Sequence, residues 1–299
     1  MSSAAPMSPG RRLRDQMNHG IVTLPGVFNA ISARAATAEG AEALYLSGAG
    51  VANALLAKPD IALVTLTEAA QQAAYVCAIT DCPVLADADT GFGESLNVER
   101  TVQEMERAGL AGIHLEDQVS PKRCGHLDGK SVVSTREMVA KLNAALATRR
   151  DPDFLIVART DARGVEGLDA AILRANAYRD TGADAIFPEG LHSEDEFARF
   201  RDAVDGPLLA NMTEFGKTPL ISVKRFEALG YNLVIFPMTA FRVMLRAISD
   251  VYRDLVQTGT QAQWLDAMKT RHELYALIDY PGYEQRDREW AKIQEGESA

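Results

Sequence analysis

The sequence predicts an α/β protein built as a (β/α)8 barrel. Short apolar segments recur about eight times along the chain, and helix-like segments separate them. An open doubly wound sheet usually has fewer strands and a glycine-rich nucleotide-binding turn after the first one, and that turn is absent here. We therefore expect one barrel domain over residues 1–299, followed within it by a helical extension at about 241–280.

The expected strands are rich in Val, Ile, Leu and Ala and lack strict polar alternation. Parallel strands that are buried on both faces have this composition. They cover residues 21–27, 43–48, 83–89, 112–117, 154–161, 183–189, 207–213 and 233–238.

The expected helices lie between these strands, and several end in glycine, as helix C-termini often do. They cover residues 67–80, 97–109, 134–150, 168–182, 194–204 and 223–230. Ser134 with Glu137 has the pattern of a capping box. After the last strand we expect amphipathic helices at 241–259 and 263–278 and then a polar tail at 281–299.

Composition indicates a soluble globular protein, with 47% hydrophobic and 24% charged residues and a net charge of −10. This charge argues against a nucleic-acid or anionic-membrane partner. No apolar run approaches the roughly 20 residues of a membrane-spanning helix. Three cysteines (Cys77, Cys82 and Cys124) and no apolar signal segment favour the reducing cytoplasm, with organelle import through the Arg-bearing start as the weaker alternative.

Polar side chains gather where the expected strands end, which in a barrel is one face. They are Tyr45, Ser47, Asp87, Asp89, Glu116, Asp117, Arg159, Asp161, Glu189, Asn211 and Thr213. Asp87, Asp89 and Glu116 would concentrate negative charge, and oxygen ligands select a hard cation such as Mg2+. The alternative for the Asp-x-Asp pair is a salt-bridged or capping role. We interpret His114, on the same strand as Glu116, as a satisfied interior histidine.

A cysteine follows this strand in a basic loop. Lys122, Arg123 and His126 flank Cys124, and nearby positive charge favours the thiolate of a cysteine. The alternative is an ordinary solvated charge run around a small filler residue. Because Gly125 and Gly129 give the loop freedom, we expect residues 120–132 to form a mobile lid.

The loop motif also carries a resemblance. Lys-Arg-Cys-Gly-His after Glu-Asp-Gln resembles the signature of the isocitrate lyase and phosphoenolpyruvate mutase superfamily, in its carbon-carbon lyase branch. Further matches extend over most of the chain and are most similar to 2-methylisocitrate lyases: SGAG at 47–50, DADTGFG at 87–93, ARTDA at 158–162, FPE at 187–189 and NMTEFGKTPL at 211–220.

The resemblance implies a site. Asp87 and Asp89 match the Mg2+-binding pair, with Mn2+ as an alternative ion and with Glu116 and Asp60 acting through water. Ser47, Gly48 and Ala49 match a Ser-Gly-Gly turn that holds the pyruvoyl carboxylate, although Ala49 replaces a glycine and a positive φ there would be strained. The remaining matches to substrate-binding positions are Cys124, Gly125, Arg159, Glu189, Asn211, Thr213, Arg242 and Arg271.

The implied reaction is Mg2+-assisted cleavage of 2-methylisocitrate to pyruvate and succinate, in propionate breakdown. Tyr45 matches the suspected base and Cys124 the proton donor, and Glu189, Arg159 and His126 are candidates to set the protonation of that thiol. Phe187, Ile235 and Pro237 match the pocket that admits the 2-methyl group. A phosphonate mutase would lack the Cys-Gly-His loop, and a non-catalytic barrel would have lost some of these residues. A dimethylmalate- or oxaloacetate-acting relative stays open as the alternative.

In the resembled family the last barrel helix is exchanged with a neighbouring subunit, and the enzymes are tetramers of paired dimers. We therefore expect a homotetramer that binds a small di- or tricarboxylate.

Overall fold

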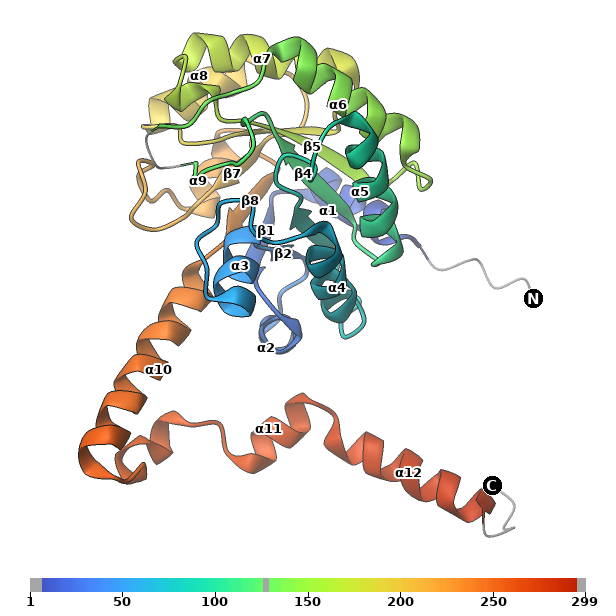
Figure 1. Ribbon diagram of the computed structural model, residues 1–299, viewed down its shortest axis with the longest axis vertical. Coiled ribbons are helices and arrows are strands. Elements are labelled where there is room, and N and C mark those ends of the chain that lie inside the picture. The colour runs from blue at the N-terminus through green and yellow to red at the C-terminus, as the bar shows by residue number, and fades with distance from the viewer. Residues whose placement is uncertain (1–6, 126–128, 295–299) are drawn as a thin grey trace. The chain divides into compact units, whose positions relative to one another are not determined.

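The computed structural model describes residues 7–125 and 129–294, and within them eight parallel strands form a nearly closed barrel (Figure 1). The strands are β1 (Val22–Val27), β2 (Leu44–Leu46), β3 (Val84–Asp87), β4 (Gly112–Glu116), β5 (Leu155–Thr160), β6 (Ala185–Pro188), β7 (Leu209–Asn211) and β8 (Leu233–Phe236). Their order is β6-β5-β4-β3-β2-β1-β8-β7, and a parallel bridge between Ile186 and Leu208 joins the two ends. The predicted barrel is confirmed, with every strand inside its expected segment.

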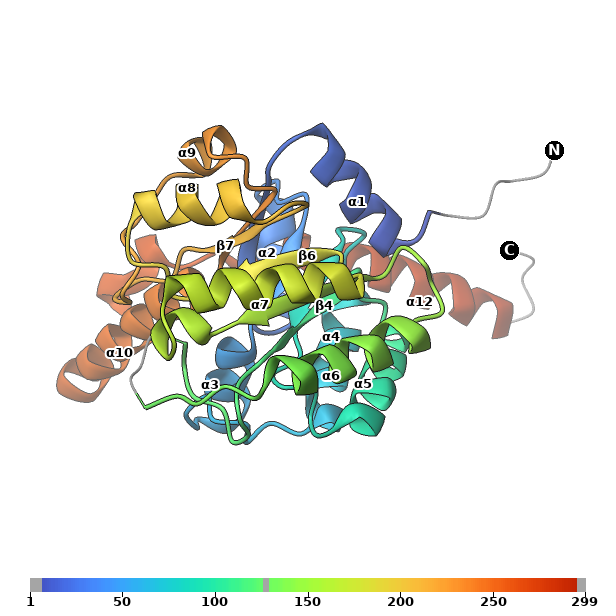
Figure 2. The same ribbon diagram turned by 90° about the horizontal axis from the view of Figure 1, so that it is seen from above.

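Helices cover the outside of the strands, and in Figure 2 α6, α7 and α8 lie side by side. The predicted helices appear as α4 (Leu66–Cys77), α5 (Ser95–Arg107), α6 (Thr135–Thr148), α7 (Leu168–Thr181), α8 (Glu194–Ala203) and α9 (Val223–Ala228). The Ser134 side chain caps α6 by accepting the Glu137 N–H, which is one of the two hydrogen bonds of the expected capping box. Two turns are 3-10 helices, η1 (Ala162–Gly164) and η2 (Ala262–Ala267).

The barrel has two apolar layers, as alternation along buried strands requires. Alternate residues such as Tyr45, Val157 and Phe187 point into the barrel and pack with Leu24 and Ile235. Their neighbours pack outward against the helices in a second, larger cluster. A packed interior leaves the polar chemistry to the carboxyl ends of the strands.

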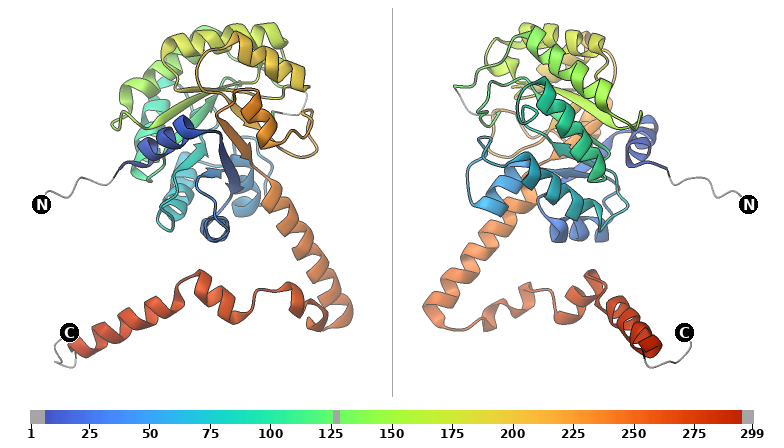
Figure 3. Two further views of the ribbon diagram at one scale, coloured as in Figure 1. Left: turned by 180° about the vertical axis from the view of Figure 1, so that it is seen from behind. Right: turned by 45° about the vertical axis from the view of Figure 1, so that its right-hand side comes forward.

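Three helices before β3 were not predicted: α1 (Pro9–His19), α2 (Ala30–Ala38) and α3 (Gly48–Leu56). The first has a readable start, because Ser8 caps it and Pro9 occupies its first position. It lies at the amino ends of the strands (Figure 3), where Arg14 donates to the Asp153 carbonyl and to Asp184. The other two are alanine- and glycine-rich, which leaves little apolar periodicity to recognise.

The chain divides into two compact units, Met1–Phe241 and Arg242–Ala299, which are described separately. The second contains most of α10 (Thr239–Thr258), α11 (Arg271–Leu277) and α12 (Tyr280–Gln294). The prediction of a single helix over 263–278 was wrong, because the chain forms η2 first and Thr270 then caps a separate helix, α11. The polar tail at 281–299 was also wrong over its first part, which is helical. The expectation of one barrel domain with a helical extension stays a prediction. Over the described residues, no helix is long and apolar enough to cross a membrane.

Candidate functional site

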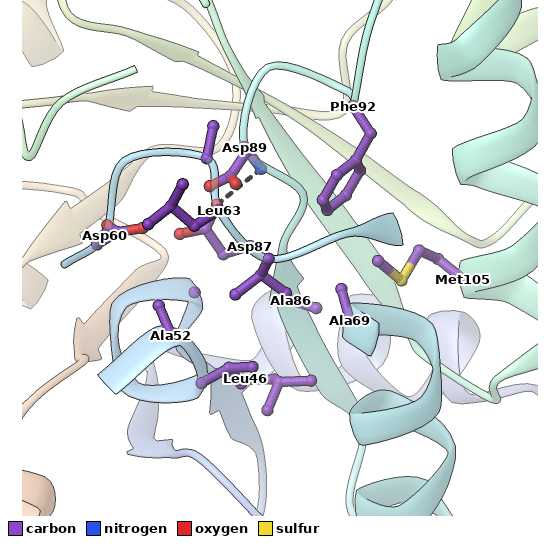
Figure 4. A pocket seen from close by; sticks show the side chains of 14 residues that line it. Leu46, Ala52, Asp60, Leu63, Ala69, Ala86, Asp87, Asp89, Phe92 and Met105 are labelled. Atoms are coloured by element: carbon purple, nitrogen blue, oxygen red, sulfur yellow. Dashed lines mark hydrogen bonds between the residues drawn. The ribbon is translucent and has the colours of Figure 1, made fainter. Parts of the chain in front are cut away.

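The end of β3 presents two carboxylates that were predicted to hold a metal (Figure 4). The Asp87 Oδ1 accepts the N–H of Asp89 at 2.9 Å, which fixes the turn between them. Asp89 has φ +48°, a left-handed conformation that aspartate tolerates better than most residues. Gly48 lies against this turn, since a β-carbon there would lie 2.6 Å from the Asp87 Oδ2. The turn therefore depends on a glycine from the neighbouring strand end.

A lysine ammonium neutralises this carboxylate cluster. Lys122 is 2% exposed, and its Nζ lies 2.6 Å from Asp60 Oδ1 and 2.8 Å from Asp89 Oδ1. Burial opposes a charged Lys122, but Asp89, Asp87, Glu116 and Asp60 together raise its pKa well above the ordinary value, so it is protonated. Lys122 was expected to act on the Cys124 thiol, but its ammonium group binds Asp60 and Asp89 instead.

The carboxyl groups of the two aspartates differ in pKa. Burial acts to raise the pKa of Asp87, but His114, Lys122 and Arg159 together hold that pKa below its ordinary value. At Asp89 burial prevails over Lys122, and the pKa is raised to about 6. One carboxylate of the pair is therefore firmly anionic.

The cluster has the donors that a magnesium ion requires. It offers only oxygen atoms, it already attracts a cation, and neither oxygen of the buried Glu116 accepts a hydrogen bond from a described residue. Across residues 7–125 and 129–294, no three His, Cys, Asp or Glu side chains converge enough to enclose an ion. Mg2+ does not need such a cage, because it is commonly held by one or two carboxylates together with water and substrate. The residues present therefore fit it.

The start of α3 (Gly48–Leu56) lies beside the carboxylates. Ser47 caps α3, and its Oγ accepts the N–H of Gly50 at 3.1 Å. The N–H groups of Gly48 and Ala49 open the helix, and such free donors favour a carboxylate. Ala49 lies inside α3 without positive φ, so the expected strain does not arise.

Tyr45 and His114 form a buried pair inside the barrel mouth. The Tyr45 hydroxyl lies 2.8 Å from His114 Nε2, which is itself 3.5 Å from Asp87 Oδ1. Burial raises the pKa of Tyr45 well above its ordinary value, with Asp87 adding to the effect, and burial lowers the pKa of His114 to about 4. His114 is interior, as predicted, but it is not satisfied, because its Nδ1 has no hydrogen-bond partner in the described part of the chain.

Arg159 is the central cation on the other side of the mouth. It is 7% exposed; its Nε donates to Asp161 Oδ2 at 2.9 Å, and its Nη1 lies 3.2 Å from Glu116 Oε2. Its Nη2 lies 3.6 Å from Glu189 Oε2, which also accepts the Asn211 Nδ2–H at 3.1 Å. The β4, β5, β6 and β7 ends thus meet here, as predicted. Thr213, just beyond β7, is buried as well.

The cysteine loop lies directly on this group. A β-carbon at Gly125 would lie 2.4 Å from Glu189 Cγ and 2.6 Å from Arg159 Nη2, so only glycine fits. Cys124 is exposed. His126 lies outside the described residues, and its role, like that of Cys124, stays a prediction.

The expected methyl-binding residues are apolar and buried. Phe187 is fully buried and packs edge-on against His114 with ring centroids 5.4 Å apart. The Arg159 guanidinium carbon lies 5.1 Å from the centroid of the Phe187 ring. Ile235 is in the same interior cluster, and Pro237 is buried after β8. Arg242 and Arg271 belong to the second unit, so their substrate-binding roles stay predictions.

Sequence reasoning was wrong about Lys122 and Asp117 and overlooked Lys130. Lys122 was assigned to the thiol, and Lys130 was not considered, although it donates to Asp161 Oδ1 at 2.9 Å. Asp117 was expected to face the site, yet its carboxylate accepts from Thr160 and Tyr178 side chains at 2.7 and 2.9 Å. Strand alternation alone could have placed Asp117 opposite Glu116.

The family model for phosphoenolpyruvate phosphomutase matches residues 11–256. The chain belongs to the PEP mutase/isocitrate lyase superfamily. It is 53% identical over 288 residues to a 2-methylisocitrate lyase of Aeropyrum pernix, covering 96% of this chain and 92% of that one. It is 45% identical over 290 residues to the 2-methylisocitrate lyase of Escherichia coli, covering 96% and 98%. The resemblance drawn from the motifs is confirmed.

Solved structures of the superfamily share the fold. A 2,3-dimethylmalate lyase superposes with a TM-score of 0.91 at 33% identity, covering 99% of this chain and 100% of that one. An oxaloacetate acetylhydrolase with 3,3-difluorooxalacetate gives 0.89 at 35% identity and the same coverage. A phosphonopyruvate hydrolase complexed with oxalate and Mg++ gives 0.83 at 27%, covering 96% and 98%. The superfamily thus spans several reactions on small carboxylic acids.

Proposed function

We propose that this protein is a Mg2+-dependent carbon-carbon lyase that cleaves 2-methylisocitrate to pyruvate and succinate, in propionate breakdown by the methylcitrate cycle. The observation that carries the proposal is the 53% identity to a 2-methylisocitrate lyase over 96% of the chain. The strand-end carboxylates, the helix start at Ser47 and the central Arg159 support the same chemistry.

The metal would be held by Asp87 and Asp89, with Glu116 and Asp60 contributing through water. When bound, the ion would act as a Lewis acid on the substrate hydroxyl and lower its pKa. The Mg++ complex of the related phosphonopyruvate hydrolase supports this choice of ion, and Mn2+ has similar ligand preferences. Because the Lys122 ammonium contacts Asp60 and Asp89, Mg2+ would compete with it for these two carboxylates.

The substrate carboxylates would be held by the protein itself. Ser47 and the N–H groups of Gly48 and Ala49 suit the pyruvoyl carboxylate at the start of α3. Arg159 offers a planar fork of donors for a second carboxylate. Asn211 and Thr213 lie at the end of β7, where the Asn211 side chain donates to Glu189 beside Arg159. We also propose substrate-binding roles for Arg242 and Arg271, which belong to the second unit.

Two groups would move protons. Tyr45 is the proposed base: because its phenol is protonated, it would pass its own proton to His114 Nε2, 2.8 Å away, as it takes the substrate hydroxyl proton. After the C2–C3 bond breaks, the carbanion beside a carboxylate needs a proton, and we assign its delivery to Cys124. Glu189, Arg159 and His126 would set the protonation of that thiol.

Substrate choice would depend on an apolar pocket formed by Phe187, Ile235 and Pro237. These side chains carry no polar atom, so a methyl group bound among them would leave no hydrogen-bonding group without a partner. A specific observation favours one other candidate, cleavage of 2,3-dimethylmalate, because that lyase superposes with a TM-score of 0.91. Its 33% identity is well below the 53% of the methylisocitrate lyase, so we place it second. An oxaloacetate-acting enzyme follows on the same reasoning.

We further propose a cytoplasmic homotetramer with exchanged C-terminal helices. Among the described residues of the second unit, large apolar side chains such as Tyr252, Val256 and Trp290 are exposed, at 65%, 88% and 64%. A neighbouring subunit would cover them. Light scattering coupled to gel filtration should report about four times the chain mass, and a monomer at micromolar concentration would refute the assembly.

Product analysis tests the proposed activity. Purified protein is incubated with 2-methylisocitrate, 2,3-dimethylmalate, oxaloacetate and isocitrate, with Mg2+ or with EDTA, and the products are identified by NMR. We expect pyruvate and succinate from 2-methylisocitrate with Mg2+ only. The Asp89→Ala variant should be inactive, whereas Asp205→Ala, which changes an exposed aspartate, should not differ from the unmodified protein. Cleavage that persists in EDTA would contradict the metal requirement.

A further inference from the structure

Lys130 lies on the returning limb of the cysteine loop and carries a charge that no assigned role explains. Its side chain is only 3% exposed, so the ammonium group is buried. It donates to Asp161 Oδ1 at 2.9 Å and also to the backbone carbonyl of Gly125. One ammonium therefore joins the residue after Cys124 to the end of β5.

Asp161 passes this contact on to the central arginine. Its carboxylate is fully buried and accepts the Arg159 Nε–H at 2.9 Å and Nη2–H at 3.2 Å as well as the Lys130 ammonium. Its own N–H is fixed by Asp117 Oδ1 at 2.8 Å. Two cations shared by one buried carboxylate make a rigid unit, because removal of either leaves an imbalance of buried charge.

The rest of the loop is held in the same arrangement. Val119 and Ser131 share a backbone hydrogen bond, and the Gln118 side chain both donates to the Arg123 carbonyl and accepts its N–H. These bonds fix the base of the loop. The Lys122 ion pairs with Asp60 and Asp89 hold its middle part, and the Lys130 bridge and the close packing of Gly125 hold Gly125 over Arg159 and Glu189.

We propose that Lys130 is a positioning residue for the lyase reaction. By binding the Gly125 carbonyl and Asp161 together, it fixes the backbone that carries Cys124 relative to Arg159. This inference rests on the proposed function, because positioning matters only if Cys124 delivers the proton. Its placement against Gly164 adds a constraint, since a β-carbon at 164 would lie 3.1 Å from Lys130 Nζ.

The test compares Lys130→Met, which keeps the length of the side chain but removes its donors, with Lys130→Arg, which keeps a cation. Lys224→Met, at an exposed position on α9, is the matched control. Amide hydrogen exchange is measured without substrate on peptides covering residues 118–125. Because charge-assisted hydrogen bonds are lost, we expect exchange about 10- to 100-fold faster in Lys130→Met and little change in the control.

Steady-state kinetics gives the second readout. We expect kcat for 2-methylisocitrate to fall about 10- to 100-fold in Lys130→Met with a much smaller change in KM, and Lys130→Arg to recover part of the loss. Unchanged loop exchange, or unchanged kcat, in Lys130→Met would overturn the inference. The exchange measurement needs no substrate, so it decides the inference even if the unmodified protein fails to cleave 2-methylisocitrate, a result that would count against the proposed function alone.

Discussion

Gly48 and Asp87 approach so closely that position 48 has no room for a side chain. A β-carbon there would lie 2.6 Å from Asp87 Oδ2 and 2.8 Å from Cγ. The glycine belongs to the helix start expected to bind a carboxylate, and the aspartate to the pair expected to bind the metal. This contact therefore links the proposed carboxylate-binding helix start to the proposed metal-binding aspartates.

Gly48→Ala should therefore weaken metal binding. The added methyl group must displace the Asp87 carboxylate, and displacing a metal ligand in this way typically costs about 10- to 100-fold in affinity. Isothermal titration with Mg2+ measures it. Gly20→Ala is the control, because Gly20 has extended backbone and its nearest neighbouring atom would be 3.9 Å from the new carbon. Equal Mg2+ affinities in the two variants would refute the contact's importance.

Cys124→Ser should bind substrate but turn over orders of magnitude more slowly, because a serine hydroxyl is a far weaker acid than a thiol. Rapid kinetics on 2-methylisocitrate gives kcat and KM. The control is Cys82→Ser, since the Cys82 thiol donates to the Ala41 carbonyl and a hydroxyl can do the same. A kcat equal to that of the control would remove Cys124 from the mechanism.

Phe187→Trp should shift preference away from 2-methylisocitrate. Phe187 is fully buried between His114 and Arg159, so a larger ring has to occupy space that the 2-methyl group would use. One methylene-sized change in an apolar pocket is worth about 10- to 200-fold in kcat/KM. Competition between isocitrate and 2-methylisocitrate measures the ratio. If this ratio of kcat/KM values is the same in Phe187→Trp as in the unmodified protein, the 2-methyl group does not bind next to Phe187.

Tyr178→Phe should destabilise the barrel without touching the site. The buried Tyr178 hydroxyl donates to Asp117 Oδ2 at 2.9 Å, and losing a hydrogen bond to a buried carboxylate costs about 1–3 kcal/mol. Thermal denaturation followed by circular dichroism measures the change. The control is Tyr252→Phe at an exposed position, which should leave the midpoint temperature of unfolding unchanged. An unchanged midpoint temperature in Tyr178→Phe would show that the hydrogen bond to Asp117 contributes nothing to stability.

The barrel was readable from the sequence because its strands are buried on both faces and therefore apolar throughout. Polar residues at strand ends likewise identified Asp87, Asp89, Arg159 and Glu189, since parallel strands bring these ends together. Small-residue helices such as α3 were missed because Gly48, Ala49 and Gly50 give no amphipathic pattern.

Long side chains were the harder case. Lys122 lies two residues from Cys124 in sequence, and this proximity suggested that its charge acts on the thiol, whereas Lys130 was not considered. In the structure their flexible stems carry the ammonium groups to Asp89 and Asp161 instead. The direction of a long side chain depends on which buried carboxylates lie within reach, and only the folded chain shows that.

The most direct test of the account is the ratio of kcat/KM for 2-methylisocitrate to that for 2,3-dimethylmalate, measured on the unmodified protein with saturating Mg2+. The 53% identical relative and the buried apolar side chains of Phe187, Ile235 and Pro237 predict a ratio well above one, with pyruvate and succinate as products. A ratio below one would contradict the proposed substrate and assign the site to the dimethylmalate reaction.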